Sequence, residues 1–443
     1  MAVKLPDWIQ EYTGQRKGAL SLLEAAPTSD TEVLTAGLRC IVDAQEKMTA
    51  AIEEGRRLVW VHLLQTPEIF RAMNIETFMA DSYGPVMAGA RKEGTAEFID
   101  VAENAGVPTD TCSLIKGEVG GILAGQMPAP SLYVTQSHPC DAMTGGIQVV
   151  ENLIGVPTFF FDAPVWNDDR ATEYYAEQVK EMVTFLEEHT GKRLDHDRLR
   201  EVVEESNRAM ELRLAVNELK RAVPCPLSSL FSMLAYQVYA VSAGSPEATD
   251  FFRLLLAHTE EQVKAGRSAT PVERIRAVWG GPPLVYGGIG GWMEQQCGAV
   301  IVVTLMGYEG YHHIDTSTYD SMMRGIARKQ LDQVMVREFH GPFEYYLDDF
   351  LRAYEEYKAD CLILPGAIRC KSLQATIGIL RDVCRERGIP MLAPEFDLFD
   401  ERVTSEEAIK AQIEQFFATT VLQWLRMSTL KRTDPHFCDG ERK

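Results

Sequence analysis

Nine cysteines are the residues of this 443-residue chain whose chemistry stands out. No export signal opens the sequence, so we expect reduced thiols that are available for metal binding or catalysis rather than a disulfide framework. None of the cysteines forms a C-x-x-C pair, which argues against zinc-ribbon, thioredoxin-like and bacterial-ferredoxin sites. A metal site built from these cysteines must therefore be assembled from distant segments.

Two of the cysteines, Cys140 and Cys370, occupy matching places in a pattern that the chain uses twice, over residues 131–162 and 361–397. Each copy reads as an apolar strand, a loop with the cysteine, a helix, a Gly-Val/Ile-Pro stop, a second apolar strand and an acidic residue. Such βαβ crossovers belong to buried parallel sheets, and both cysteines fall at strand carboxyl ends, where a helix N-terminus favours the thiolate. This placement suggests one site shared by two similar units.

A third cysteine, Cys112, lies at or near the start of another helix, which carries Gly117, Gly120 and Gly121. Glycines there allow a bulky group to approach the backbone closely. A capped helix with a buried thiol is an equally good interpretation. We expect Cys40 and Cys297 to be packing residues and Cys225, between two prolines, to lie in a turn, and Cys438 falls in a polar tail.

Histidine and acidic residues near the candidate loops give weaker evidence for a catalytic role than the cysteines do. His138 could donate a hydrogen bond to a sulfur or act as a proton donor, although a structural role is favoured. The pair His312-His313 lacks the H-E-x-x-H spacing, and G-x-S-x-G is absent, so a hydrolase is disfavoured. Glu395 and Asp397 either reach the site or serve as cap or salt-bridge residues, so we assign no general base.

Nucleotide and nucleic-acid binding are also disfavoured. The glycines of residues 287–291 do not match G-x-G-x-x-G, and no G-x-x-x-x-G-K-[ST] occurs, so any ATP must be hydrolysed by another protein. A formal charge of −20 and a pI near 5.0 argue against a nucleic-acid or anionic-membrane surface. The longest apolar run, at about residues 299–306, is too short for a membrane span, and we expect a cytoplasmic protein.

The length suits two or three domains rather than one core. We predict an α/β fold with two similar parallel-sheet units of Rossmann or flavodoxin-like type, in addition to helical segments. The predicted order is a helical N-terminal region over 1–80, a first unit over 81–169 with Cys112 and Cys140, a helical cap or spacer over 170–275, a second unit over 276–425 with Cys370, and a polar tail over 426–443. Leu58–Leu63 is a candidate first strand.

Three short segments also carry a family resemblance. They are Cys112-Ser-Leu-Ile-Lys, Ser137-His-Pro-Cys140-Asp and Ala367-Ile-Arg-Cys370, the last followed by Gly-Ile-Pro390 and Glu395-Phe-Asp397. In this order, with the architecture between them, they resemble the cysteine motifs of the 2-hydroxyacyl-CoA dehydratase and benzoyl-CoA reductase family, over about residues 60–425. The resemblance implies a [4Fe–4S] cluster held by Cys112, Cys140 and Cys370.

Such a cluster implies a specific chemistry. Three thiolates on four irons leave one iron with an exchangeable site, as catalysis requires. In dehydratases of the family this iron binds the thioester carbonyl of an acyl-CoA and donates one electron, and the resulting ketyl radical eliminates water before the electron returns. The resemblance also implies a separate ATP-hydrolysing activator protein and a related sister subunit, in a heterodimer or a homodimer.

Three alternatives stay open at this point. One is a subunit of a benzoyl-CoA-type reductase, in which the electrons stay in the aromatic ring. Another is a relative with a double-cubane [8Fe–9S] cluster, which would hold about twice the iron. From another class, the chain could be a scaffold or redox partner whose cysteines bind a structural metal. The sequence does not indicate which acyl group is used.

Overall fold

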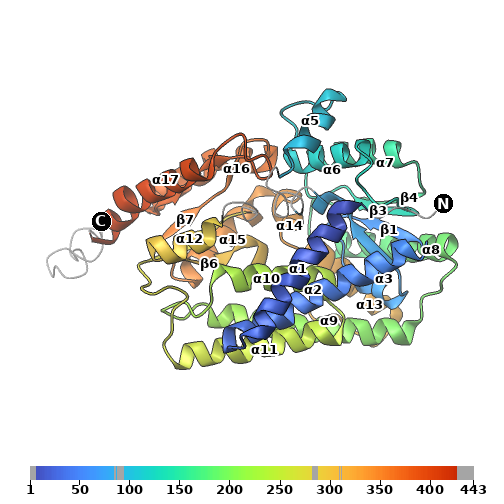
Figure 1. Ribbon diagram of the computed structural model, residues 1–443, viewed down its shortest axis with the longest axis horizontal. Helices are drawn as coiled ribbons and strands as arrows, with labels where there is room; N and C mark the ends of the chain where they lie inside the picture. Colours follow the sequence, from blue (N-terminus) through green and yellow to red (C-terminus); the bar gives the residue numbers. More distant parts are fainter. Residues whose placement is uncertain are drawn as a thin grey trace.

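Two parallel sheets with the same strand order form the two halves of the protein (Figure 1). The first has the order β2-β1-β3-β4, with strands β1 (Leu58–Val61), β2 (Glu76–Met79), β3 (Leu132–Gln136) and β4 (Thr158–Phe161). The second has the order β6-β5-β7-β9, with strands β5 (Ile275–Trp279), β6 (Ala299–Thr304), β7 (Cys361–Ile363) and β9 (Met391–Leu392). The flavodoxin-like order of both sheets confirms the predicted α/β fold with two similar units.

This computed structural model describes residues 6–83, 86, 94–281, 288–308, 310 and 312–426. Gly287 of the glycine-rich stretch, Cys438 and all but the first residue of the expected polar tail over 426–443 lie outside these ranges. Within them, no helix combines the length and the apolar composition that crossing a membrane requires.

The first sheet is covered on both faces, as an apolar parallel sheet requires. In β1, Leu58 and Trp60 pack against helices α6 (Ser113–Leu123) and α7 (Asp141–Ile154), together with the start of α1 (Asp7–Ala25). Val59 and Val61 face the opposite way, toward α8 (Asp169–Thr190) and α13 (Tyr319–Leu331). The crossover from β3 through α7 to β4 is the one that the sequence pattern predicts.

The two units are interleaved along the chain, which the predicted boundaries do not capture. The first sheet begins with β1 and β2, before residue 81, and α13 crosses from the second half of the chain to cover the first sheet. Met322, Met323 and Ile326 form one apolar side of α13, and an apolar sheet face is the surface that buries it. Periodicity alone does not indicate which sheet such a helix covers.

The second sheet is surrounded by its own core. Its crossover runs from β7 through α16 (Lys371–Arg387) to β9, as predicted, and a short extra sheet pairs β8 (Gly366–Ala367) with β10 (Glu395–Phe396). The helices of this unit, besides α16, are α12 (Ile289–Trp292), α14 (Val336–Phe339), α15 (Phe343–Glu356) and α17 (Glu406–Phe416), with π-helical turns at Met293–Cys297 and Phe417–Val421 and a 3-10 turn at Leu305–Gly307.

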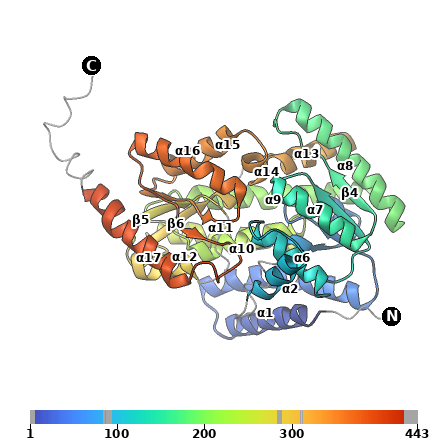
Figure 2. The same cartoon turned by 90° about the horizontal axis from the view of Figure 1, so that it is seen from above.

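A helical layer lies beside both sheets, along the lower side of Figure 1. It joins α2 (Ser29–Glu53) to α9 (His196–Leu219), α10 (Ser229–Ser242) and α11 (Pro246–Lys264) in one core. The N-terminal region and the middle segment, predicted as separate helical parts, therefore pack together; Figure 2 shows the same arrangement from above. In the described part of the first unit there are also three shorter helical elements: α3 (Glu68–Ala72), a 3-10 turn (Ala80–Ser82) and α5 (Ala96–Asn104).

Gly120 permits the close packing of α6 against α5. A Cβ atom at this position would lie 1.8 Å from the backbone oxygen of Phe98, so the glycine accommodates another helix. We expect Gly120→Ala to lower the free energy of unfolding by about 1–3 kcal/mol, because the backbone must shift. Gly145→Ala in α7 is the matched control, since nothing lies within 4 Å of its Cβ, and it should be neutral or stabilising by about 0.5–1 kcal/mol. Urea denaturation of both variants distinguishes the two cases, and equal midpoints would contradict the packing argument.

Candidate active site

Three cysteines converge on one cavity from three helix N-termini. Cys112 is the N-cap residue of α6, Cys140 that of α7 and Cys370 that of α16. All three line the same cavity of about 640 Å³. Cys140 and Cys370 follow the central strands β3 and β7, so they lie at the carboxyl edges of both sheets, where α/β proteins bind ligands. The structure thus brings together the three cysteines that the sequence singles out.

The three thiols influence one another electrostatically. Burial raises the pKa of Cys112, and negative charge on Cys370 and Cys140 raises it further. Burial likewise raises the pKa of Cys370, to about 11, and proximity to Cys140 adds to the shift. Three neighbouring thiolates therefore need positive charge between them, and a bound metal centre supplies such charge.

The first turns of the three helices partly compensate for this cost. Backbone N–H groups favour each thiolate and lower its pKa: Leu114 acts on Cys112, Ala142 and Met143 on Cys140, and Ser372 and Leu373 on Cys370. The same geometry, with N–H groups two or three residues beyond the cysteine, recurs at each position. Each helix N-terminus is thus prepared for a negatively charged sulfur.

Contacts between the two units hold the cysteines in place. The Ser372 hydroxyl of the second unit favours the thiolate of Cys140 in the first. Lys371, the first residue of α16, forms an ion pair with Asp110 at 2.8 Å, two residues before Cys112. Farther out, Arg402 donates hydrogen bonds to Asp100 at 2.9 and 3.0 Å. The relative position of the units therefore sets the geometry of the site.

Asp397, which follows β10, pairs with an arginine of the loop that carries Cys370. Asp397 is buried, pairs with Arg369 at 3.1 Å and accepts hydrogen bonds from the backbone N–H groups of Phe399 and Asp400, both at 3.0 Å. Glu395 is exposed on β10. The contacts of Asp397 are those of a salt bridge and a turn, and, in addition to burial, its negative charge raises the pKa of Cys112 and of Cys370.

Three cysteine thiols at one cavity are a donor set that would fit cubane ligation by an iron-sulfur cluster. Within the described ranges, no group of three or more His, Cys, Asp or Glu side chains is arranged to hold a single metal ion.

The other described cysteines lie in the hydrophobic cores. Cys40 packs in the helical core, as expected, but it also lines the same cavity as the three candidate ligands. It lies within α2 and not at a helix N-terminus, which distinguishes it from Cys112, Cys140 and Cys370. Cys297 packs against the core of the second unit. Cys225 lies outside regular secondary structure between its two prolines, and it is fully buried. Cys361 and Cys384 are buried in the same second core.

The histidines have neighbours of their own. His138 is buried, with Nε2 at 3.4 Å from the amide nitrogen of Gln330 and its ring 6.0 Å from that of His340, which supports the structural interpretation. His312 pairs with Asp332, and His313 with Glu211 at 3.3 Å.

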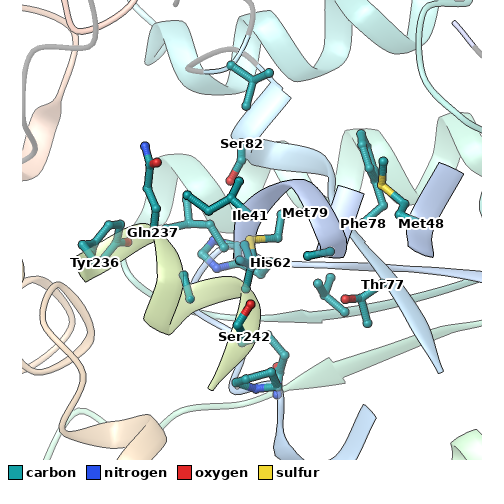
Figure 3. Close-up of a pocket in the computed structure, with 18 of the residues that line it drawn as sticks. Ile41, Met48, His62, Thr77, Phe78, Met79, Ser82, Tyr236, Gln237 and Ser242 are labelled. Atoms are coloured by element: carbon teal, nitrogen blue, oxygen red, sulfur yellow. The ribbon is translucent and has the colours of Figure 1, made fainter. Parts of the chain in front are cut away.

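Many other residues that line the cavity carry no motif in the sequence. Residues of α1, α2 and α10 contribute to the lining, and Figure 3 shows Ile41 and Met79 next to His62, with Tyr236 and Gln237 of α10 farther to the left. His62 directly follows β1, so its place at a strand carboxyl end is a signal that could have been read. The helices from the N-terminal region carry no local signal of this kind.

Comparisons with known proteins place the chain in a family. The family model described as 2-hydroxyglutaryl-CoA dehydratase, D-component, matches residues 63–419, and the chain belongs to this family. A benzoyl-CoA reductase subunit of Thauera aromatica is 24% identical over 358 residues, 75% of this chain and 81% of that protein. The (R)-phenyllactyl-CoA dehydratase alpha subunit of Clostridium sporogenes is 23% identical over 379 residues, which cover 82% of this chain and 89% of that protein. The (R)-2-hydroxyisocaproyl-CoA dehydratase alpha subunit of Clostridioides difficile is 25% identical over 230 residues, which cover 49% of this chain and 56% of that protein.

The matched region includes Cys112, Cys140 and Cys370. The relatives are dehydratases and a reductase, and each is named as a subunit. The family predicted from the cysteine motifs is confirmed.

Proposed function

We propose that this chain is the iron-sulfur subunit of an ATP-activated 2-hydroxyacyl-CoA dehydratase. The observation that carries the proposal is the convergence of Cys112, Cys140 and Cys370 on one cavity. These three residues would hold a [4Fe–4S] cluster. When bound, the cluster supplies one low-potential electron and an iron with an open coordination position. A related sister subunit and a separate ATP-hydrolysing activator complete the proposed system, since the sequence has no P-loop.

The chain's own residues prepare the site in two ways. The first-turn N–H groups after each cysteine direct positive dipoles at the sulfur atoms and stabilise the thiolates. The apolar side chains around the cavity, among them Phe78, Met143 and Phe339, exclude water from the reacting thioester.

The cavity favours an apolar acyl group. The three guanidinium groups among the described lining residues are already engaged. Arg71 donates hydrogen bonds to the carbonyls of Val241 and Ala243, Arg16 donates one to the Tyr12 hydroxyl, and Arg198 donates one to Glu201 at 2.9 Å. The remaining cation of the lining, Lys47, is solvent-exposed. We expect kcat/KM for 2-hydroxyisocaproyl-CoA to exceed that for 2-hydroxyglutaryl-CoA by at least about tenfold, because a buried carboxylate without a partner is costly. Competition between the two thioesters in one assay measures this ratio directly, and a ratio of one or less would rule out an apolar chamber.

A product assay tests the reaction itself. The complex of this chain with its sister subunit and activator is given 2-hydroxyisocaproyl-CoA or benzoyl-CoA, and the thioesters are analysed by mass spectrometry. Loss of water from the first without net consumption of reductant supports a dehydratase. A second candidate is a benzoyl-CoA-type reductase, favoured by the likeness to the Thauera aromatica reductase, and it would instead add electrons and protons to the ring.

A further inference from the structure

Asp397 lies against the turn that presents Cys370. This turn is closed by the backbone N–H of Cys370, which donates to the Ala367 carbonyl at 2.9 Å. The strand just before Asp397, β10, pairs with β8, which opens the turn. The two residues that follow Asp397, Leu398 and Phe399, line the cavity together with the three cysteines. The Asp397 carboxylate is therefore fixed at the side of the site that the second unit forms.

Asp397 is the buried end of a row of alternating charges that joins the two units. Its carboxylate accepts a hydrogen bond from Arg369 at 3.1 Å, and Arg369 also donates to Asp400 at 3.0 Å. Arg402 donates to Asp400 at 2.8 and 3.1 Å and to Asp100 of α5 at 2.9 and 3.0 Å. Three carboxylates thus share two guanidinium groups, so the row retains one negative charge.

The charge of Asp397 is the least compensated of the three. Asp397 has a share of one guanidinium group, whereas Asp400 contacts two, and the charge of Asp100 is screened because this residue is exposed. Asp397 is 1% exposed, so water screens it little. In addition to burial, its negative charge raises the pKa of Cys112 and of Cys370. Asp397 and these two thiols therefore share one buried region.

The turn itself does not require a charged side chain. Asp397 Oδ1 accepts the backbone N–H groups of Phe399 and Asp400, both at 3.0 Å, and the amide oxygen of an asparagine could accept the same bonds. A buried carboxylate beside the thiolates also disfavours their negative charge. A charged residue at this position thus has a cost that a neutral one would avoid, and its effect on the bound group is the feature that distinguishes the two.

We propose that the buried carboxylate of Asp397 keeps the reduction potential of the cluster low. This inference rests on the proposed function and assigns Asp397 an electrostatic role toward the cofactor. Reduction adds one electron, supplied by the activator in the proposed system, and changes no covalent bond. A fixed negative charge nearby disfavours the more negative, reduced form. The reduced cluster is then a stronger one-electron donor to the thioester.

The reduction potential of the Asp397→Asn variant tests the proposal. This substitution removes the charge and keeps an oxygen atom for the turn. The iron-loaded complex of the chain with its sister subunit is titrated anaerobically with a strong chemical reductant, and EPR spectroscopy follows the reduced cluster, with iron content confirmed for each variant. We expect the equilibrium to shift about tenfold toward the reduced form, which makes the potential about 59 mV less negative for one electron.

Arg369→Gln tests the sign of the effect. It removes the cation that partly compensates Asp397, so the potential should become more negative. Both substitutions break the same ion pair, and a merely structural effect would not follow the sign of the charge that is removed. Opposite shifts in the two variants therefore identify an electrostatic origin.

Asp400→Asn is the matched control. Asp400 is 2% exposed and binds the same guanidinium group, but it lies beyond Arg369 from Asp397 and has Arg402 as a second partner. Its substitution removes the same charge and breaks a similar contact. We expect a shift of less than about a third of that in Asp397→Asn, because the charge lies farther along the row.

The outcomes separate this inference from the proposed function. An unchanged potential in Asp397→Asn, or a shift equal to that in Asp400→Asn, would overturn the inference. Loss of iron from both Asp397→Asn and Arg369→Gln would also overturn it, because the row would then hold the cluster and not adjust its potential. If only one of these two variants keeps its iron, the direction of its shift decides. A wild-type complex without iron would instead contradict the proposed function.

Discussion

Replacing Cys112, Cys140 or Cys370 with serine is expected to remove nearly all bound iron and to lower activity at least about 100-fold. Mutation of groups that only support a metal ligand costs about 10–100-fold, so loss of a ligand itself should cost no less. The structure adds a specific reason, since the three thiols share one cavity and each has its own helix N-terminus. Iron analysis and the dehydration assay on each anaerobically purified variant measure the effect.

Cys297→Ser is the matched control for this prediction. Cys297 is half-buried, as the three candidate ligands are, but it ends a π-helical turn and packs against the second core. It should keep its iron and its activity. A Cys140→Ser protein with full iron, or a Cys297→Ser protein without any, would contradict the assignment of the ligands.

The second large effect is on stability, at a buried ion pair that ties α13 to the first unit. Glu68 is 0% exposed and binds Lys329 of α13, which also donates to Ser206 at 3.0 Å and lies 4.7 Å from the centre of the Tyr239 ring. We expect Lys329→Met to lower the free energy of unfolding by about 3–5 kcal/mol, because it leaves a buried carboxylate unpaired. Urea denaturation near pH 7 provides the value.

The double variant Glu68→Gln, Lys329→Met distinguishes the cost of an unpaired charge from the cost of altered packing. It should recover more than half of the loss, since no unpaired charge then remains. If the double variant is less stable than Lys329→Met, the cost comes from packing and not from charge.

The pH dependence of this pair has a definite sign. Burial alone would raise the pKa of Glu68. The positive charge of Lys329, together with hydrogen bonds from Lys329 and Ser206, brings this pKa below its usual value. A carboxyl with a lowered folded pKa stabilises the protein above its unfolded pKa, and this stability is lost as the pH falls through the folded value. The wild-type protein should therefore lose stability on acidification below about pH 4, and Lys329→Met should lose less over the same range.

The cysteine-bearing crossovers were predictable because their signals are local. The apolar run of β3, the αL glycine Gly155 at the end of α7 and the following proline lie within one short segment, and the same holds for Gly388 after α16. Parallel pairing then places the following loops at one edge. The convergence of Cys140 and Cys370 follows from this edge together with the contact between the two units.

The remaining parts of the site depend on contacts between residues that are far apart in the sequence. Gln330 and Lys329 are neighbours on α13, whose pattern shows an amphipathic helix but not the sheet that it covers. Residues of α2 such as Ile41 line the cavity because the helical layer packs beside the first sheet, and no motif marks them. Gln136 and Gln330 meet beside His62 although they are 194 residues apart in the chain.

The content of iron and acid-labile sulfide per chain, measured on protein purified without oxygen, decides whether the three cysteines hold a cluster. We expect about four irons and four sulfides, both lost in a Cys112→Ala, Cys140→Ala, Cys370→Ala triple variant. About eight irons would point to the double-cubane alternative. No iron in the wild-type chain, or equal iron in the triple variant, would contradict the proposed cluster and the function built on it.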